Sequence, residues 1–196
     1  MVQWAMVMDV RRCTGCQGCT VACKSENEVP LGVFRTHVRY YEIGEYPDVH
    51  RARVPHICNH CKNAPCVDVC PTGASQKRKD GIVFVDYDTC IGCKSCMAAC
   101  PYGARFIHPD LEVADKCTFC MHRVDADIVP SCVNTCQGGT RIFGDLDDPD
   151  SEVSKLIATN PTTVMKPGQG TEPQVYYIGA DTTLDTDVSP GQKEVI

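Results

Sequence analysis

The chain has 196 residues, of which 43% are hydrophobic, so it is long enough for one large or two small packed domains. Its net charge is −6 and no basic stripe occurs along it, which argues against a nucleic-acid-binding protein. Cysteine is the unusual residue type, because the sixteen cysteines approach the frequency that marks a cysteine-based scaffold.

All sixteen cysteines fall into four groups of four. The first group follows a short apolar strand predicted at residues 4–8. The first and third groups read C-x2-C-x2-C-x3-C, and Pro101 after the third group completes the run found in bacterial ferredoxins. The groups are Cys13, Cys16, Cys19 and Cys23; Cys58, Cys61, Cys66 and Cys70; Cys90, Cys93, Cys96 and Cys100; and Cys117, Cys120, Cys132 and Cys136.

The spacing of the cysteines distinguishes among disulfides, zinc sites and iron–sulfur clusters, the three common roles of a cysteine-rich chain. Cysteines two or three positions apart cannot bridge one another without strain. A structural zinc site usually takes its ligands as two separated pairs. Three closely spaced cysteines with a fourth four residues later suit a larger cluster instead. The sequence therefore predicts four [4Fe–4S] clusters as cofactors, with all sixteen cysteines as their metal ligands.

Further elements are predicted between and after the groups. Strands are expected at residues 33–43, 82–85, 105–107 and 141–143, and short helices at residues 20–23 and 97–100. Beyond residue 144 we expect a helix at residues 151–158 with Asp150 or Ser151 as its N-cap, and a strand at residues 175–178. The residues from Asp181 onward are expected to form an extended tail that wraps a partner or stays mobile. The order of strand, cysteine loop, short helix and strand is that of a ferredoxin and predicts an α+β fold.

The chain contains an internal repeat. Residues 9–23 align without a gap to residues 86–100, including the four cysteines and the glycine at Gly15 and Gly92. The second and fourth groups also resemble each other, although the fourth has seven more residues between its second and third cysteines. The chain therefore reads as a duplicated unit with two cysteine groups in each copy.

The fourth cysteine of each group is expected to serve a different cluster from the first three, as in two-cluster ferredoxins. We prefer to pair the second group with the third, because the 19 residues between Cys70 and Cys90 are a compact connection, and the first group with the fourth. Pairing the first group with the second and the third with the fourth is the alternative. The preferred ligand sets are Cys13, Cys16, Cys19 and Cys136; Cys117, Cys120, Cys132 and Cys23; Cys58, Cys61, Cys66 and Cys100; and Cys90, Cys93, Cys96 and Cys70.

This pairing implies two ferredoxin-like modules, one inserted in the other. Residues 56–107 would form the inserted module, and residues 1–55 with residues 108–145 would form the discontinuous one. Residues 146–196 are expected to be a C-terminal extension and tail for partner contact. Four clusters in so small a protein suggest a wire along which electrons pass between two docking faces.

No catalytic residue is assigned, so the chain is expected to be a non-catalytic electron-transfer subunit. The histidines near the groups are not needed as ligands, because every group already supplies four thiolates. Cations beside the cysteine loops would raise cluster potentials if they face the clusters, although a solvated side chain explains each of them equally well. These cations are Lys24, Lys62, Lys94, Lys116 and Arg123.

The N-terminal residues show no secretory signal, and no apolar segment approaches the roughly 20 residues that span a bilayer. A soluble or peripheral protein is therefore expected. A folded metalloprotein can still cross a membrane attached to a partner that carries the signal. We expect a peripheral position on the periplasmic side of the inner membrane, with a cytoplasmic position as the alternative.

The sequence resembles the four-cluster beta subunit of the dimethyl sulfoxide reductase-type molybdopterin oxidoreductases. Besides the four groups, the resemblance rests on CPTGA at residues 70–74, CPYGA at 100–104, KCTFC at 116–120 and FGDLDDPDS at 143–151. ACKSENEVP at residues 22–30 and GEYPDV at 44–49 are most similar to the polysulfide and thiosulfate reductase branch. Arsenate, arsenite and tetrathionate enzymes have similar subunits.

The resemblance implies a complex in which this subunit connects a large molybdopterin catalytic subunit to a separate, quinone-reactive membrane anchor. It also implies the crossed ligand pairing. In many relatives proline follows the last cysteine of the fourth group, whereas Gln137 follows Cys136 here, so that loop is expected to differ. A free-standing polyferredoxin and a cluster subunit of an unrelated complex, such as a hydrogenase, are the alternatives. Residues 33–43 and the last fifty residues favour a fixed partner, because a simple carrier does not need them.

Overall fold

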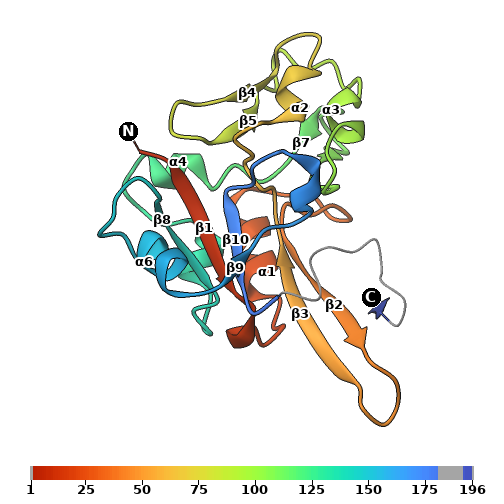
Figure 1. The fold of residues 1–196 in the computed structure, drawn as a ribbon. Coiled ribbons are helices and arrows are strands. Elements are labelled where there is room, and N and C mark those ends of the chain that lie inside the picture. Colours follow the sequence, from red (N-terminus) through yellow and green to blue (C-terminus); the bar gives the residue numbers. More distant parts are fainter. Residues whose placement is uncertain (1, 181–191, 196) are drawn as a thin grey trace.

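The fold is known from a computed structural model, which describes residues 2–180 and the backbone of residues 192–195. The helices are short and the strands form four separate sheets (Figure 1). The helices are α1 (Gly18–Glu26), α2 (Pro65–Asp68), α3 (Ser95–Ala98), α4 (Met121–Val124), α5 (Ser131–Asn134) and α6 (Glu152–Thr159), with 3-10 turns η1 (Val10–Arg12) and η2 (Pro167–Gln169). The strands are β1 (Trp4–Asp9), β2 (His37–Ile43), β3 (His50–His56), β4 (Ser75–Lys77), β5 (Val83–Val85), β6 (Phe106–Ile107), β7 (Ala114–Asp115), β8 (Arg141–Asp145), β9 (Thr162–Thr163), β10 (Val175–Ile178) and β11 (Gln192–Val195).

A four-stranded sheet of order β8-β1-β10-β9 forms the centre of the molecule. Strand β1 pairs antiparallel with β8 and parallel with β10. Its side chains alternate between two faces, because successive residues of a strand point to opposite sides. Met6 and Met8 join the main core that contains cysteines, whereas Ala5 and Val7 pack with Val153 of α6. All four of these β1 residues have an exposed fraction of 0%, so β1 is buried on both faces.

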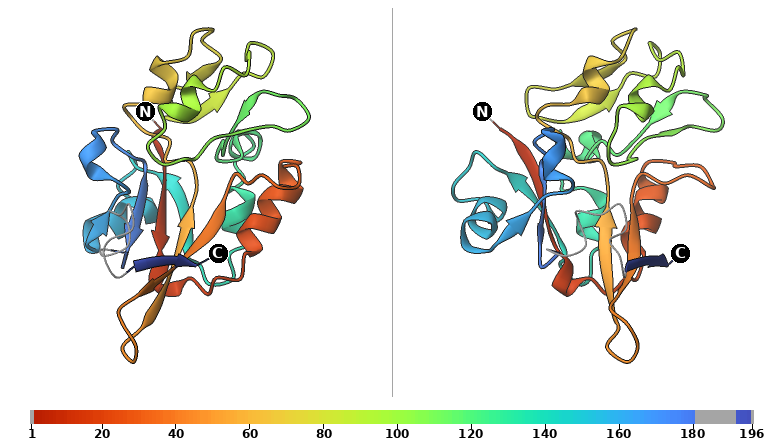
Figure 2. Two further views of the ribbon diagram at one scale, coloured as in Figure 1. Left: turned by 90° about the vertical axis from the view of Figure 1, so that its right-hand side faces the viewer. Right: turned by 45° about the vertical axis from the view of Figure 1, so that its right-hand side comes forward.

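The second sheet is a long hairpin of β2 and β3, with β11 paired to the free edge of β2. The hairpin projects from the bottom of the molecule in Figures 1 and 2. The small hairpins β4–β5 and β6–β7 complete the strands. Helices α2 and α3 pack together at the top of both figures, while α1 packs against α5 further down.

Several predicted elements are confirmed. The predicted strands at residues 4–8, 82–85 and 175–178 correspond to β1, β5 and β10, and those after the third and fourth groups to β6 and β8. Helix α6 begins after Ser151, whose hydroxyl accepts a hydrogen bond of 3.1 Å from the Ser154 backbone N–H, as expected of an N-cap. Helix α1 is longer than predicted, and the strand predicted at residues 33–43 begins only at His37.

Strand β3 was not predicted, because HRARVPH is mostly polar and lacks a clean alternation. It forms because its backbone pairs with β2 along seven residues, and only Val54, Pro55 and His56 at its end are buried. The predicted tail lies partly outside the described residues, and its described part is strand β11 on the edge of β2. Strand β10 of the predicted C-terminal extension lies inside the central sheet, so this stretch is part of the core.

Tyr177 provides a test of this packing. Its hydroxyl donates a 2.9 Å hydrogen bond to the buried Pro55 carbonyl, which Tyr177→Phe would leave without that donor. We expect Tyr177→Phe to lower the free energy of unfolding by about 1–3 kcal/mol, measured by denaturant unfolding at matched iron content. Tyr176→Phe on the other face of β10 is the control, with an expected change below about 0.5 kcal/mol. Equal stability of the two variants would contradict this role.

Candidate metal centres

The structure gathers the sixteen thiols into four sets, each drawn from two of the sequence groups. Set A lines one cavity, set B a second and set D a third, with about 350, 290 and 320 Å³ of empty space respectively. The sets are A, with Cys13, Cys16, Cys19 and Cys136; B, with Cys117, Cys120, Cys132 and Cys23; C, with Cys58, Cys61, Cys66 and Cys100; and D, with Cys90, Cys93, Cys96 and Cys70.

Set C is recognised by the electrostatic interaction of its thiols. Burial and then the thiols of Cys58, Cys66 and Cys100 raise the pKa of Cys61 to about 12. Burial also raises the pKa of Cys66, and Cys58 and Cys100 contribute again. Cys58 and Cys61 are also buried in the main core, and Cys66 and Cys100 pack against that core. All four sets coincide with the ligand sets preferred from the sequence.

In the first group, helix geometry explains why the fourth cysteine belongs to a different set from the other three. Cys19 and Cys23 lie four residues apart on α1 and are both buried. Residues at this spacing share a helix face but are offset by about 6 Å along the axis. Cys19 lines the cavity of set A, whereas Cys23 lines that of set B beside Cys132 of α5.

Sheet pairing explains why the first and fourth groups meet. Strand β1 leads into the first group, and β8 follows the fourth. The pairing of Met8 with Arg141, and a 2.8 Å hydrogen bond from the Asp9 backbone N–H to the Thr140 carbonyl, hold these ends together. Strand β2 supports the first loop from the other side, because the Tyr40 hydroxyl donates a 2.6 Å hydrogen bond to the Gly15 carbonyl.

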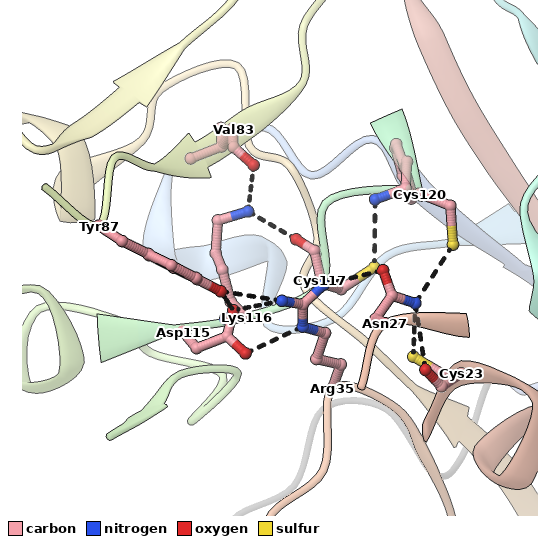
Figure 3. Close-up of polar contacts among 10 residues, drawn as sticks. Cys23, Asn27, Arg35, Val83, Tyr87, Asp115, Lys116, Cys117 and Cys120 are labelled. Atoms are coloured by element: carbon pink, nitrogen blue, oxygen red, sulfur yellow. Dashed lines mark hydrogen bonds and ion pairs between the residues drawn. The ribbon is translucent and has the colours of Figure 1, made fainter. Parts of the chain in front are cut away.

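Several sulfur atoms accept hydrogen bonds from N–H groups, which is how proteins stabilise thiolate ligands and tune clusters. The backbone N–H of Ser75 donates to Cys70 Sγ at 3.3 Å, and that of Thr140 donates to Cys136 Sγ at 3.3 Å. The side-chain amide of Asn27 donates to two sulfurs of set B, at 3.6 Å each (Figure 3).

The donor set fits an iron–sulfur cluster better than a single ion. In the described part of the chain, no three His, Cys, Asp or Glu side chains converge closely enough to hold one metal ion. The thiols instead surround cavities, and no aspartate or glutamate is among the described residues that line the cavities of sets A, B and D. Sulfur-only donors spread around a space match the thiolate preference of [4Fe–4S] clusters.

Burial and hydrogen bonding shift the pKa values of individual thiols in opposite directions. Burial and neighbouring thiols raise the pKa of Cys23 to about 12, whereas the Gly18 backbone N–H lowers the pKa of the exposed Cys16. The Cys23 thiol therefore keeps its proton until iron replaces it, so binding of iron at this residue releases a proton.

The sets follow one another in the order A, B, C, D. Helix α1, which carries Cys19 of set A, packs against α5, which carries Cys132 of set B, and α2 of set C packs against α3 of set D. Cys19 of set A acts electrostatically on Cys132 of set B, and Cys58 of set C acts on Cys117 of set B. Between B and C, the rings of His60 and Phe119 stack with centroids 3.7 Å apart. These residues occupy the same position in the second and fourth groups, so the contact joins equivalent loops of the repeat.

Of the cations predicted beside the cysteine loops, Lys116 has an exposed fraction of only 1%. Lys24 donates to the Pro30 and Val33 carbonyls, and Arg123 pairs with Glu26. Lys62 and Lys94 are exposed. Sequence reasoning missed two buried cations beside the thiols, Arg105 and Arg141. Their signal was present, because each lies five residues after the last cysteine of its group.

The described helices include none with the length and apolar character that a membrane span requires.

The fold and the four thiol sets define a ferredoxin-type iron–sulfur protein. A family model described as a 4Fe-4S dicluster domain matches residues 49–146, and one described as a 4Fe-4S binding domain matches residues 12–29.

Comparison with curated proteins is more specific. The chain is 47% identical to the B subunit of tetrathionate reductase from Salmonella typhimurium, over 94% of this chain and 75% of the relative. It is 41% identical to the B subunit of selenate reductase from Mesobacillus selenatarsenatis, over 90% of this chain and 72% of the relative. It is 39% identical to the arsenate respiratory reductase iron-sulfur subunit ArrB of a Shewanella species, over 88% of this chain and 94% of the relative. The chain belongs to the iron–sulfur (B) subunits of the molybdopterin reductases, and it is an electron-transfer subunit with four [4Fe–4S] clusters.

Two glycines with left-handed backbones offer a matched test of the loop geometry. A Cβ on Gly92 would lie 2.4 Å from the Glu112 carbonyl oxygen, whereas a Cβ on Gly103 would meet nothing within 4 Å. Both substitutions force alanine into a positive φ, but only Gly92→Ala also clashes with backbone. We expect Gly92→Ala to lose one cluster's share of the iron and Gly103→Ala to keep its full content, measured by iron and sulfide analysis. Full iron content in Gly92→Ala would contradict this prediction.

Proposed function

We propose that the chain carries electrons between a molybdopterin catalytic subunit and a quinone-reactive membrane anchor in a respiratory oxidoreductase. The observation that carries this proposal is the succession of four thiol sets in the order A, B, C, D. The clusters supply the one-electron carriers. The protein fixes them in one order and surrounds them with buried side chains, which suits transfer between two ends better than storage.

We propose that each thiol set is the ligand set of one cluster, so that the fourth cysteine of every group binds with the first three of another. The cavities of sets A, B and D support this assignment, and so do the mutual pKa effects within set C. The corresponding architecture is a module of residues 56–107 inserted in one of residues 1–55 and 108–145. The packing of α2 on α3 and of α1 on α5 supports it.

The ligand assignment is tested by replacing Cys136 and Cys132 one at a time with alanine. They lie in the same sequence group but in sets A and B respectively. We expect Cys136→Ala to damage the cluster of Cys13, Cys16 and Cys19, and Cys132→Ala to damage a different one. Electron paramagnetic resonance of the reduced proteins would then show the loss of different signals. Loss of the same signal in both variants would contradict crossed ligation.

We propose that the catalytic partner reduces a sulfur compound of the polysulfide or thiosulfate type, with tetrathionate, arsenate and arsenite as alternatives. The segments at residues 22–30 and 44–49 favour this class, and the 47% identity to a tetrathionate reductase subunit is compatible with sulfur chemistry. The substrate site itself would lie in the partner. We further propose a peripheral position on the periplasmic side of the inner membrane after export with that partner.

A free-standing polyferredoxin is the competing function. The hairpin of β2 and β3 favours a fixed partner, because its tip extends beyond what the first cysteine loop needs (Figure 2). Co-purification from the native source distinguishes the two functions. A complex requires a large pterin-containing chain to elute with this protein, together with about sixteen irons per copy, as four [4Fe–4S] clusters require. Elution of the iron-loaded chain alone would contradict the complex.

A further inference from the structure

Three cations are buried among the cysteine sets without a carboxylate partner in the described part of the chain. They are Arg141, Lys116 and Arg105, with exposed fractions of 3%, 1% and 6%. A buried charge that lacks a counter-charge is strongly unfavourable. The groups able to balance these cations are therefore the thiolate-ligated clusters, which are anionic even when oxidised.

Arg141 lies between sets A and B. It lines the cavity of set A, and its Nη2 donates a 2.8 Å hydrogen bond to Thr36 Oγ1. Its Nη1 is buried and has no hydrogen-bond partner among the described residues. Burial opposes the charge, yet Cys132 of set B and Cys19 of set A outweigh it and raise the pKa of Arg141.

Arg105 holds the equivalent position between sets C and D. It lines the cavity of set D, and its Nη2 donates a 2.8 Å hydrogen bond to Ser75 Oγ. Its Nε and Nη1 are buried without an acceptor in the described structure. Burial lowers the pKa of Arg105, but Cys66 and Cys58 of set C and Cys96 of set D outweigh it. Each arginine thus donates to one hydroxyl, lines a thiol cavity, and leaves further buried N–H groups without a hydrogen-bond partner among the described residues.

Lys116 lies between sets B and C, which are the remaining pair of neighbouring sets. Its Nζ donates to the backbone carbonyls of Val83 and Cys117, the latter at 2.6 Å (Figure 3). Cys117 belongs to set B, and the charge of Lys116 also lowers the pKa of Cys66 in set C. Carbonyl acceptors orient the ammonium without neutralising it.

Arg35 is a buried cation in the same region whose charge is neutralised by a carboxylate. It is also largely buried, but it forms an ion pair of 2.9 Å with the buried Asp115 (Figure 3). The Tyr87 hydroxyl also donates to Asp115, at 2.8 Å. The chain therefore supplies a carboxylate to one buried cation and withholds it from the three that lie between neighbouring sets.

We propose that Arg141, Lys116 and Arg105 are positioning residues that raise the reduction potentials of the two clusters flanking each of them, one cation at each step of the A, B, C, D series. Adding an electron to an anionic cluster is unfavourable in a buried site, and a fixed cation beside it stabilises the reduced form. A cation shared by two neighbours favours an electron on either one, so it eases transfer across that step. This inference rests on the proposed electron-transfer function and ligand sets.

Potentiometric titration monitored by electron paramagnetic resonance tests the proposal on the iron-loaded chain. We expect Arg141→Met, Lys116→Met and Arg105→Met each to lower two of the four potentials at unchanged iron content. Each shift should be at least tenfold in the reduction equilibrium constant, or about 59 mV for a one-electron couple. The pairs shifted by Arg141→Met and Arg105→Met should be different, and Lys116→Met should share one cluster with each.

The controls separate charge from packing. Arg141→Lys and Arg105→Lys keep the charge and should retain potentials close to the original. Arg51→Met removes an exposed cation that pairs with Glu42 and should shift none. If a methionine variant loses iron, the matching glutamine variant, which keeps N–H donors without charge, replaces it in the comparison.

Unchanged potentials in iron-complete variants would overturn the proposal, as would lysine variants that shift as far as the methionine ones. Either result would leave the electron-transfer function standing. A different result, elution of the protein without a pterin-containing partner, would contradict the proposed electron-transfer function.

Discussion

The structure depends on one geometric constraint, which is that four sulfur atoms must surround a space and cannot simply follow one another along the chain. A loop supplies three of them, and the fourth cysteine of the run, about one helical turn further on, reaches a neighbouring space instead. Each set therefore needs a sulfur from a distant segment. Cys136 can join Cys13 only because β8 lies beside β1 in the register that pairs Arg141 with Met8. The central sheet is thus the element that closes set A.

The same constraint explains the parts of the chain that carry no cysteine. The segment before β10 holds the loop of the second group, through hydrogen bonds from the Lys62 and Asn63 backbone N–H groups to the carbonyls of Glu172 and Thr171. Strand β10 then continues into the sheet beside β1. The C-terminal region therefore fixes loops around set C as well as completing the sheet, which a two-cluster ferredoxin of minimal length has no need to do.

The sequence was most informative where chemistry imposes a spacing. The sixteen cysteines, the strands at β1, β5, β8 and β10, and the Ser151 cap were all predictable, because ligand runs, apolar strands and caps are local signals. Strand β3 was not, because its polar sequence is held by pairing with β2 rather than by its own pattern. The two buried arginines were also missed, because an arginine at the start of a strand suggests solvent. Their shared spacing from the last cysteine was visible, but the fold was needed to show that Arg105 and Arg141 line thiol cavities and have no carboxylate partner among the described residues.

Iron-anomalous diffraction from crystals of the iron-loaded chain would distinguish crossed ligation from ligation within one group, because it locates each cluster and its ligands at once. We expect four separate cubanes in the order A, B, C, D, each bound by three cysteines of one sequence group and the fourth cysteine of another. A cubane bound by all four cysteines of a single group would contradict this expectation, as would ligands shared between the first and second groups.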